Sequence, residues 1–137
     1  RIAMLWGNEN TLRDPVGATY PADKQITTTV ADQIADENSL YRYYCKLLAI
    51  RHKHPAIARG IYNVLKSPDK HLACFAIDYE SSTLGLIHNN STTDTLSIDL
   101  ADWDVDFTQL CDCIGVGSAS LEGTVLTIGP QTSVIIK

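Results

Sequence analysis

The sequence of 137 residues has no long apolar run and no excess of positive charge. No stretch approaches the roughly 18 consecutive apolar residues of a membrane span. Its 11 lysines and arginines are outnumbered by 16 acidic residues, for a net charge of −5. These features exclude a membrane-spanning segment and argue against nucleic acid or an anionic membrane as a partner.

A targeting signal is also missing. No signal peptide is visible, and the chain begins at Arg1 rather than at methionine. We therefore expect the chain to be part of a longer protein whose targeting signal lies elsewhere. The sequence leaves the localisation open.

Motifs for nucleophilic catalysis, phosphate binding and zinc binding are absent. No serine or cysteine stands in a nucleophile context, and no glycine pattern predicts a phosphate loop. Only one residue separates Cys111 from Cys113, where a zinc pair needs two to four, and a strand would point both side chains to one face. For these two and for Cys45 and Cys74 we favour free thiols over one disulfide, and a disulfide over a metal site.

The run DLADWDVDF places carboxylates at alternate positions, which is typical of a calcium loop. An EF-hand numbered from Asp102 would need glycine in place of Phe107 and glutamate in place of Cys113. We therefore favour a solvated loop over a cation site. The histidines do not converge either: His52 and His54 lie on different helix faces, and His71 and His88 are isolated on strands. We predict no cofactor and no metal site.

The strongest local pattern is a helix over about 39–54. At about 100° per residue, apolar side chains collect on one side. This stripe consists of Leu40, Tyr43, Tyr44, Leu47, Leu48 and Ile50. Ser39 or Asn38 can cap the start, and Pro55 disfavours helical geometry beyond His54. The stripe requires a partner surface, so we expect the isolated chain to self-associate.

An irregular arm, 1–35, precedes this helix, with one helical turn expected over Val30–Ala35. After Gly60 the pattern alternates, as in strands. The predicted strands are Ile61–Lys66, His71–Tyr79, Leu84–Asn90, Asp94–Leu100, Thr108–Ile114, Thr124–Ile128 and Thr132–Ile136. The run CFAID is apolar on both faces, which favours a central strand. Seven to eight short strands predict a mainly β fold, an antiparallel sandwich or barrel.

The run DENSLYRYYCKLLAIRHKHPAIARGIY resembles the closing segment of the catalytic barrel in glycoside hydrolase family 13, the α-amylase family. The matching positions are Asp36, Ser39, Leu40, Leu47, Arg51, Pro55, Ile57 and Gly60. RIAMLWG is similar to the family's R-x-P-M-x-W stretch, with Ala3 in place of the usual proline. The closing strands, ending in QTSVIIK, resemble the family's C-terminal Greek-key sandwich.

The resemblance implies that 1–59 is the end of a (β/α)8 barrel and 60–137 a C-terminal Greek-key β-sandwich. Family enzymes are retaining α-glucan hydrolases or transglycosylases that use an Asp/Glu/Asp set on the barrel strands. That set lies upstream of the segment that RIAMLWG resembles, so we expect no catalytic activity from this chain alone. The missing barrel is its expected partner, and any calcium of the parent would be held by residues outside this chain. A secreted or cell-surface parent is compatible with the family.

Two tryptophans are candidate sugar contacts, because aromatic faces stack on sugar rings. The resemblance places Trp6, and with it Arg1, near the substrate cleft of the intact enzyme. Trp103 lies in a turn between predicted strands, where it is either an exposed binding platform or, as we favour, a core or turn anchor. Arg51, in the middle of the stripe, is expected to form a structural charge pair within the fold or with a barrel carboxylate. Asn89 and Asn90 each begin an N-x-S/T sequon, which matters only in a eukaryotic secretory host.

Three hypotheses about function remain. The first is an enzyme fragment, in which the last barrel helix and the sandwich cover and stabilise the barrel. The second is an independent α-glucan-binding module that holds sugar through Trp103. The third is a protein-interaction domain that docks through its apolar helix. The helix motif favours the first, because it specifies a barrel neighbour.

Overall fold

The computed structural model describes residues 4–7 and 28–137. The chain divides into two compact units, one up to Leu48 and one from Ala49 to Lys137. This division falls inside a helix, whereas the predicted domain boundary lies between residues 59 and 60. Arg1 and most of the predicted arm lie outside the described residues.

In the first unit, α1 (Val30–Ala35) forms the helical turn that the sequence predicts. Its start is a capping box: the Asp32 backbone N–H donates to Thr29 Oγ1 (3.1 Å), and the Thr29 backbone N–H donates to Asp32 Oδ2 (2.8 Å). Such reciprocal bonds satisfy donors that the first helical turn leaves unpaired. The segment around Trp6 is fixed to this helix, because Val30 N–H donates to Leu5 O at 2.7 Å.

The predicted long helix is α2 (Leu40–Lys53). Ser39 caps it, since Arg42 N–H donates to Ser39 Oγ at 3.2 Å. The helix stops before Pro55, as predicted, because the proline ring disfavours helical geometry at His54. Pro55 itself has helical dihedral angles and starts the short α3 (Ala56–Arg59).

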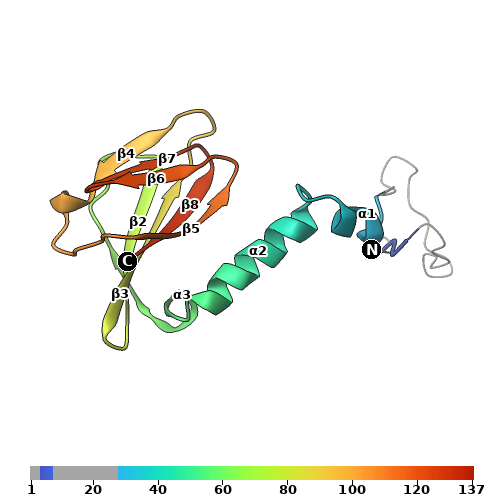
Figure 1. Cartoon of the computed structure of the whole chain (residues 1–137), viewed down its shortest axis with the longest axis horizontal. Coiled ribbons are helices and arrows are strands. Elements are labelled where there is room, and N and C mark those ends of the chain that lie inside the picture. The colour runs from blue at the N-terminus through green and yellow to red at the C-terminus, as the bar shows by residue number, and fades with distance from the viewer. Residues whose placement is uncertain (1–3, 8–27) are drawn as a thin grey trace. The chain divides into compact units, whose positions relative to one another are not determined.

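The second unit is a β-sandwich of two antiparallel sheets, which confirms the predicted fold class (Figure 1). The larger sheet has the order β1-β2-β3-β8-β5, and the smaller has the order β4-β7-β6. The strands are β1 (Ile61–Val64), β2 (Leu72–Tyr79), β3 (Ser82–Asn89), β4 (Leu96–Asp99), β5 (Leu110–Gly115), β6 (Ala119–Glu122), β7 (Val125–Ile128) and β8 (Thr132–Ile136). A short 3-10 helix, η2 (Leu100–Asp102), follows β4.

The main core lies between the two sheets. Its buried members are Leu72, Cys74, Ala76, Ile87, Ile98, Leu100, Trp103, Phe107, Leu126, Ile128, Val134 and Ile136. The alternation of side chains along each strand explains which strand residues enter this core, because every second residue of a strand points to the same face. In β8, for example, Thr132, Val134 and Ile136 are all fully buried.

A second cluster covers the other face of the larger sheet. There Ile77, Leu84 and Ile135 are buried beneath Ala56 of α3, with Ile50 at the end of α2 packed alongside. Strand β2 therefore buries side chains on both faces, which accounts for the apolar run CFAID. Burial on both faces suits an inner strand, and β2 lies between β1 and β3.

Strand β6 is not among the seven strands that the sequence pattern predicts individually. It has only four residues and no β-branched side chain, so its propensity signal is weak. A two-residue loop joins Glu122 to Val125 in β7, and Gly123 supplies the positive φ of 59°. Positive φ at the first loop position is what a tight hairpin of this twist requires.

The turns before β6 and β8 meet at a glycine contact. A Cβ on Gly117 would lie 2.8 Å from the backbone of Gly129. Gly129 N–H donates to Ser118 O at 2.8 Å, and Gly117 N–H donates to Thr132 Oγ1 at 2.9 Å. The close approach of two backbones explains why both positions lack a side chain.

Candidate functional site

Exposed large apolar side chains are unevenly distributed over the described residues. All of them except Val116 and Val125 lie between Met4 and Val64. The helix α2 alone contributes Leu40, Tyr41, Tyr43, Tyr44, Leu47 and Leu48. An exposed cluster of this kind marks a surface that binds something. We refer to these six α2 side chains as the α2 face.

The α2 face is the stripe that the sequence predicts, with Tyr41 added. Its side chains are 39% to 66% exposed, and α2 has no fully buried residue. Ile50, the remaining member of the predicted stripe, packs against the second core cluster instead.

Where α2 ends, a polar junction joins the chain to the sandwich. His54 Nε2 lies 2.5 Å from Asp112 Oδ2, and Lys53 Nζ lies 2.9 Å from the same oxygen. An ionised carboxylate can only accept, so His54 carries its proton on Nε2. The side chain of His54 is 4% exposed and that of Lys53 is 59% exposed. His54 therefore makes the enclosed contact, and Lys53 makes the outer one.

Burial alone raises the pKa of the Asp112 carboxyl, but the hydrogen bonds from His54 and Lys53 and the electrostatic attraction of these two groups outweigh it. The net effect holds the pKa of Asp112 below its ordinary value. Asp112 is therefore charged at neutral pH, and it connects strand β5 to the end of α2.

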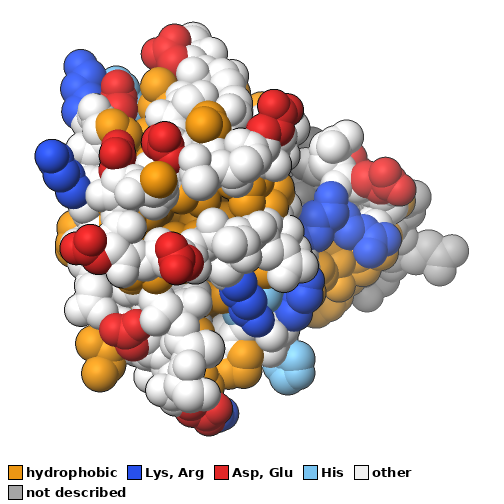
Figure 2. Space-filling view, turned by 60° about the vertical axis from the view of Figure 1, so that its left-hand side comes forward, with side chains coloured by type: hydrophobic (Ala, Val, Ile, Leu, Met, Phe, Trp, Pro, Cys, Tyr) orange, Lys and Arg blue, Asp and Glu red, His pale blue; other side chains and the backbone are white. Residues whose placement is uncertain are grey.

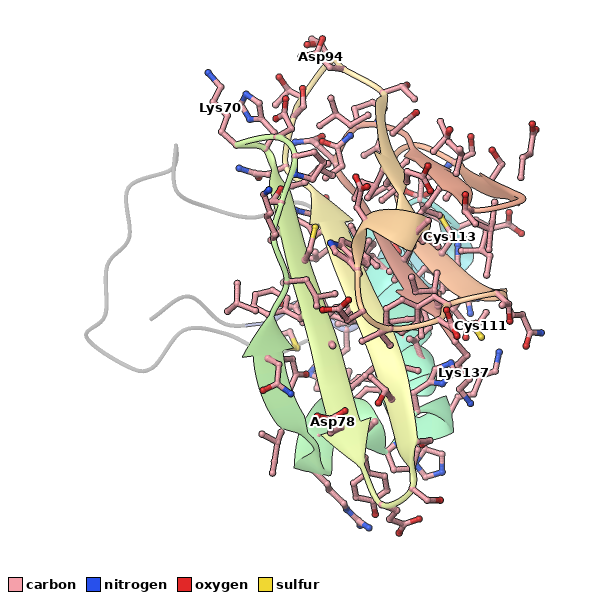
Figure 3. The ribbon with its side chains drawn as sticks, turned by 90° about the vertical axis from the view of Figure 1, so that its left-hand side faces the viewer. Lys70, Asp78, Asp94, Cys111, Cys113 and Lys137 are labelled. Carbon is pink, nitrogen blue, oxygen red and sulfur yellow. The ribbon has the colours of Figure 1, made fainter. Side chains whose placement is uncertain are left out.

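Sequence reasoning missed this junction, because it considered His54 only as a possible metal ligand together with His52. The two residues are 58 positions apart, so no local period connects them. A β-bulge between Leu110 and Asp112 also shifts the register of β5. Cys111 therefore packs against the second core cluster, while Cys113 lies opposite Val134 of the main core. The expectation that both cysteines share a face was wrong; Figure 3 labels both.

The candidate sugar contacts differ in exposure. Trp6 is 59% exposed, while Trp103 is only 8% exposed. Trp103 donates from Nε1 to Lys66 O at 2.9 Å and packs edge-to-face on Phe107 at 6.2 Å. In this position Trp103 anchors the core and presents no free ring face for a sugar. Arg51 is exposed and forms no ion pair with any described residue.

The carboxylates of the described residues do not assemble into a metal site. Among residues 4–7 and 28–137 no group of three or more His, Cys, Asp or Glu side chains could hold an ion. On the face shown in Figure 2, acidic side chains are scattered over the sandwich. Asp99 instead caps η2, accepting from Ala101 N–H at 3.1 Å.

The four cysteines are free thiols. None of the described helices is long and apolar enough to cross a membrane.

One predicted sequon has a structural role. Asn89 is fully buried, and its Nδ2 donates to the carbonyl oxygens of Asp94, Ile128 and Gly129 at 2.8, 3.1 and 3.0 Å. Its Oδ1 accepts from Ser91 N–H at 2.9 Å. The side chain thus ties the loop after β3 to the end of β7, while Asn90 is exposed.

Two curated relatives match most of the chain. Alpha-amylase 3 of Dictyoglomus thermophilum is 27% identical over 103 residues, which cover 74% of this chain and 19% of that enzyme. Alpha-amylase SusG of Bacteroides thetaiotaomicron is 33% identical over 96 residues, which cover 65% of this chain and 14% of that enzyme. The chain therefore spans less than a fifth of the length of either relative. No protein-family model matches it.

Solved structures share the fold. Amy13B of Eubacterium rectale has a TM-score of 0.82 at 21% identity, covering 98% of this chain and 27% of that protein. The trehalulose synthase MutB of Pseudomonas mesoacidophila MX-45 has a TM-score of 0.64 at 24% identity, covering 80% of this chain and 19% of that enzyme.

These matches first define a class of fold: a β-sandwich with preceding helices, which is also found as one part of Amy13B and of MutB. Within that class, the sequence is similar to the sequences of two alpha-amylases, which supports the predicted resemblance to the α-amylase family, glycoside hydrolase family 13.

Proposed function

We propose that this chain is a non-catalytic part of an α-amylase-family enzyme and that it covers and stabilises the catalytic barrel. The parent would hydrolyse or transfer α-glucosidic linkages in starch-like glucans. The observation that carries the proposal is the α2 face, a set of exposed side chains on a helix whose sequence resembles the closing helix of the family's barrel. The barrel of the same polypeptide is the partner that would bury it.

The sandwich supports this role because it is complete by itself. Its main core is closed between the two sheets, and the second cluster holds the end of α2 and α3 on the larger sheet. The junction of His54 with Asp112 adds a polar tie at the same end of the helix. The sandwich can therefore fix the position of the last helical turn of α2.

Catalysis is not assigned to this chain. A retaining glycosidase needs two carboxylates about 5 Å apart, one as nucleophile and one as acid/base. The family resemblance puts those groups in the barrel, before the segment that RIAMLWG resembles. Trp6, which is exposed, would contact sugar only in the intact enzyme, together with Arg1.

The test is to produce the parent's barrel and this chain as separate polypeptides and to combine them. We expect a stable complex, a barrel with a higher melting temperature, and starch hydrolysis only when the barrel is present. Changing Tyr44 and Leu47 to lysine should abolish the complex, because it would bury charges without partners. Val116→Lys is the matched control, since this valine is 79% exposed and lies outside α2. A complex that survives the double substitution would contradict the proposal.

The binding-module hypothesis is tested on the chain alone. In an amide NMR titration with maltoheptaose, we expect no shifts at the strands, because the ring of Trp103 is enclosed. Shifts that cluster around Trp103 at sub-millimolar ligand would instead favour a glucan-binding sandwich. A stable complex with a protein other than the barrel would favour the interaction-domain hypothesis.

A further inference from the structure

The sandwich has four edge strands, and β1 differs from the other three in charge. Each of the others carries an acidic residue: Asp99 in β4, Asp112 in β5 and Glu122 in β6. Proteins commonly use such charges to keep sheet edges from pairing with other chains. Strand β1 has the sequence IYNV and no charged residue. When an acidic edge pairs with the same edge of a second copy, like charges come together, whereas self-pairing of β1 brings no charged residues of the strand together.

The exposure of β1 points the same way. Ile61 is 71% exposed and Val64 is 81% exposed, and all four residues of the strand are exposed. Figure 3 shows this strand, in green, at the edge of the larger sheet beside β2, whose end is marked by Asp78. The outer side of β1 is bonded to no strand of the larger sheet.

The backbone of β1 presents its free groups at two residues. Leu65 N–H donates to Cys74 O at 2.9 Å, so every second residue counted back from Leu65 directs its backbone N–H and C=O groups toward β2. These residues are Asn63 and Ile61. Tyr62 and Val64 therefore turn their N–H and C=O groups outward.

We propose that β1 is a strand-addition surface for a second copy of this chain, paired antiparallel about a two-fold axis at Asn63. In that register Tyr62 of one copy faces Val64 of the other, and both exchange backbone hydrogen bonds. Aromatic and β-branched side chains are favourable cross-strand neighbours, and the symmetry forms this pair twice. The two larger sheets become one continuous sheet.

The side chains need little rearrangement for this pairing. The Tyr62 ring already packs edge-to-face on Phe75 at 5.9 Å, and its hydroxyl donates to Ile57 O at 2.7 Å. Asn63, at the axis, donates from Nδ2 to Asp78 Oδ2 at 2.7 Å within its own sheet. A preordered edge loses little conformational entropy on pairing. The strand is short, so the association should be weak and concentration-dependent.

The experiment is amide hydrogen exchange of the full chain over a concentration series. We expect exchange at Tyr62 and Val64 to slow as the concentration rises, while exchange at Asn63 and Leu65 stays slow throughout. A sample that mixes labelled and unlabelled chains should show intermolecular contacts between the Tyr62 ring and the Val64 methyl groups.

The matched variants are Val64→Lys and Val116→Lys, at valines of almost equal exposure, 81% and 79%. Val64→Lys should weaken the association by roughly tenfold or more, because it places a lysine on the paired edge. Val116→Lys should leave it unchanged. Association without protection at Tyr62 and Val64, as through the α2 face, would overturn the proposal, and so would a monomer at every concentration. The proposal does not depend on the assignment of the barrel as a partner.

Discussion

Two sets of similar apolar side chains lie in this molecule, one between the sheets and one on α2. Leu126 of the main core is fully buried, while Leu48 of the α2 face is 57% exposed. Both are leucines in regular structure, so residue type alone does not decide burial. The sandwich buries its own apolar side chains, and the side chains of the α2 face stay exposed. The difference separates the part of the chain that buries its own apolar side chains from the part that leaves them exposed.

The largest difference in stability between two matched variants should come from truncating Leu126 and Leu48. Leu126→Ala removes a fully buried side chain and should lower the free energy of unfolding by about 2–5 kcal/mol, because it leaves a cavity between the sheets. Leu48→Ala should change it by less than about 0.5 kcal/mol. Urea denaturation of both variants measures the difference. Equal losses would show that Leu48 is buried in the isolated chain in solution, which would remove the contrast.

The next effect concerns two adjacent asparagines. Asn89→Ala leaves the carbonyl groups of Asp94, Ile128 and Gly129 without their donor and should cost about 1–3 kcal/mol. Asn90→Ala, at an exposed neighbour, should be close to neutral. Thermal unfolding followed by circular dichroism compares them. If the two variants melt together, the loop after β3 is not held by Asn89.

Local patterns in the sequence predicted much of the fold. The stripe and its cap located α2, and alternation located most of the strands, because helix and strand periods are properties of neighbouring residues. The short β6 lacked such a signal. Neither the pairing of β5 with β8 nor the contact of His54 with Asp112 could be predicted, since both join residues far apart in sequence. A histidine at a helix end and an acid within an apolar strand were the only hints.

The same limit explains why the sequence did not predict the hydrogen bonds of Asn89 and did not decide the burial of Trp103. Asn89 forms part of a sequon, and that pattern says nothing of the three carbonyl groups around its side chain. Trp103 could be assigned to the core only as the favoured alternative, because burial of a turn residue depends on which strands surround it. The sequence indicates which residues form strands, and the pairing of the strands decides which polar groups are enclosed.

The third effect depends on pH. Asp112→Asn removes the charge that His54 and Lys53 bind and should cost about 1–2 kcal/mol at pH 7. The pKa of Asp112 is lowered in the folded state, so its contribution is complete above the ordinary value of 3.8 and is lost as the pH falls through the lower folded-state pKa. The stability difference between wild type and variant should therefore be constant near neutral pH and shrink below about pH 4. A difference that grows on acidification would contradict this assignment.

The smallest effect separates the two partners of Asp112. Lys53 is 59% exposed, and an ion pair in that setting contributes only about 0–1 kcal/mol. Lys53→Met should therefore lower stability slightly, and the loss should vanish at high salt, which screens exposed charges. Lys46→Met, on the same helix but without an ion pair among the described residues, controls for the change in helix composition. His54→Leu should cost more than Lys53→Met and depend little on salt, because it removes an enclosed hydrogen bond. A larger loss from Lys53→Met would show that the exposed ion pair, rather than the buried histidine, holds the end of α2 on the sheet.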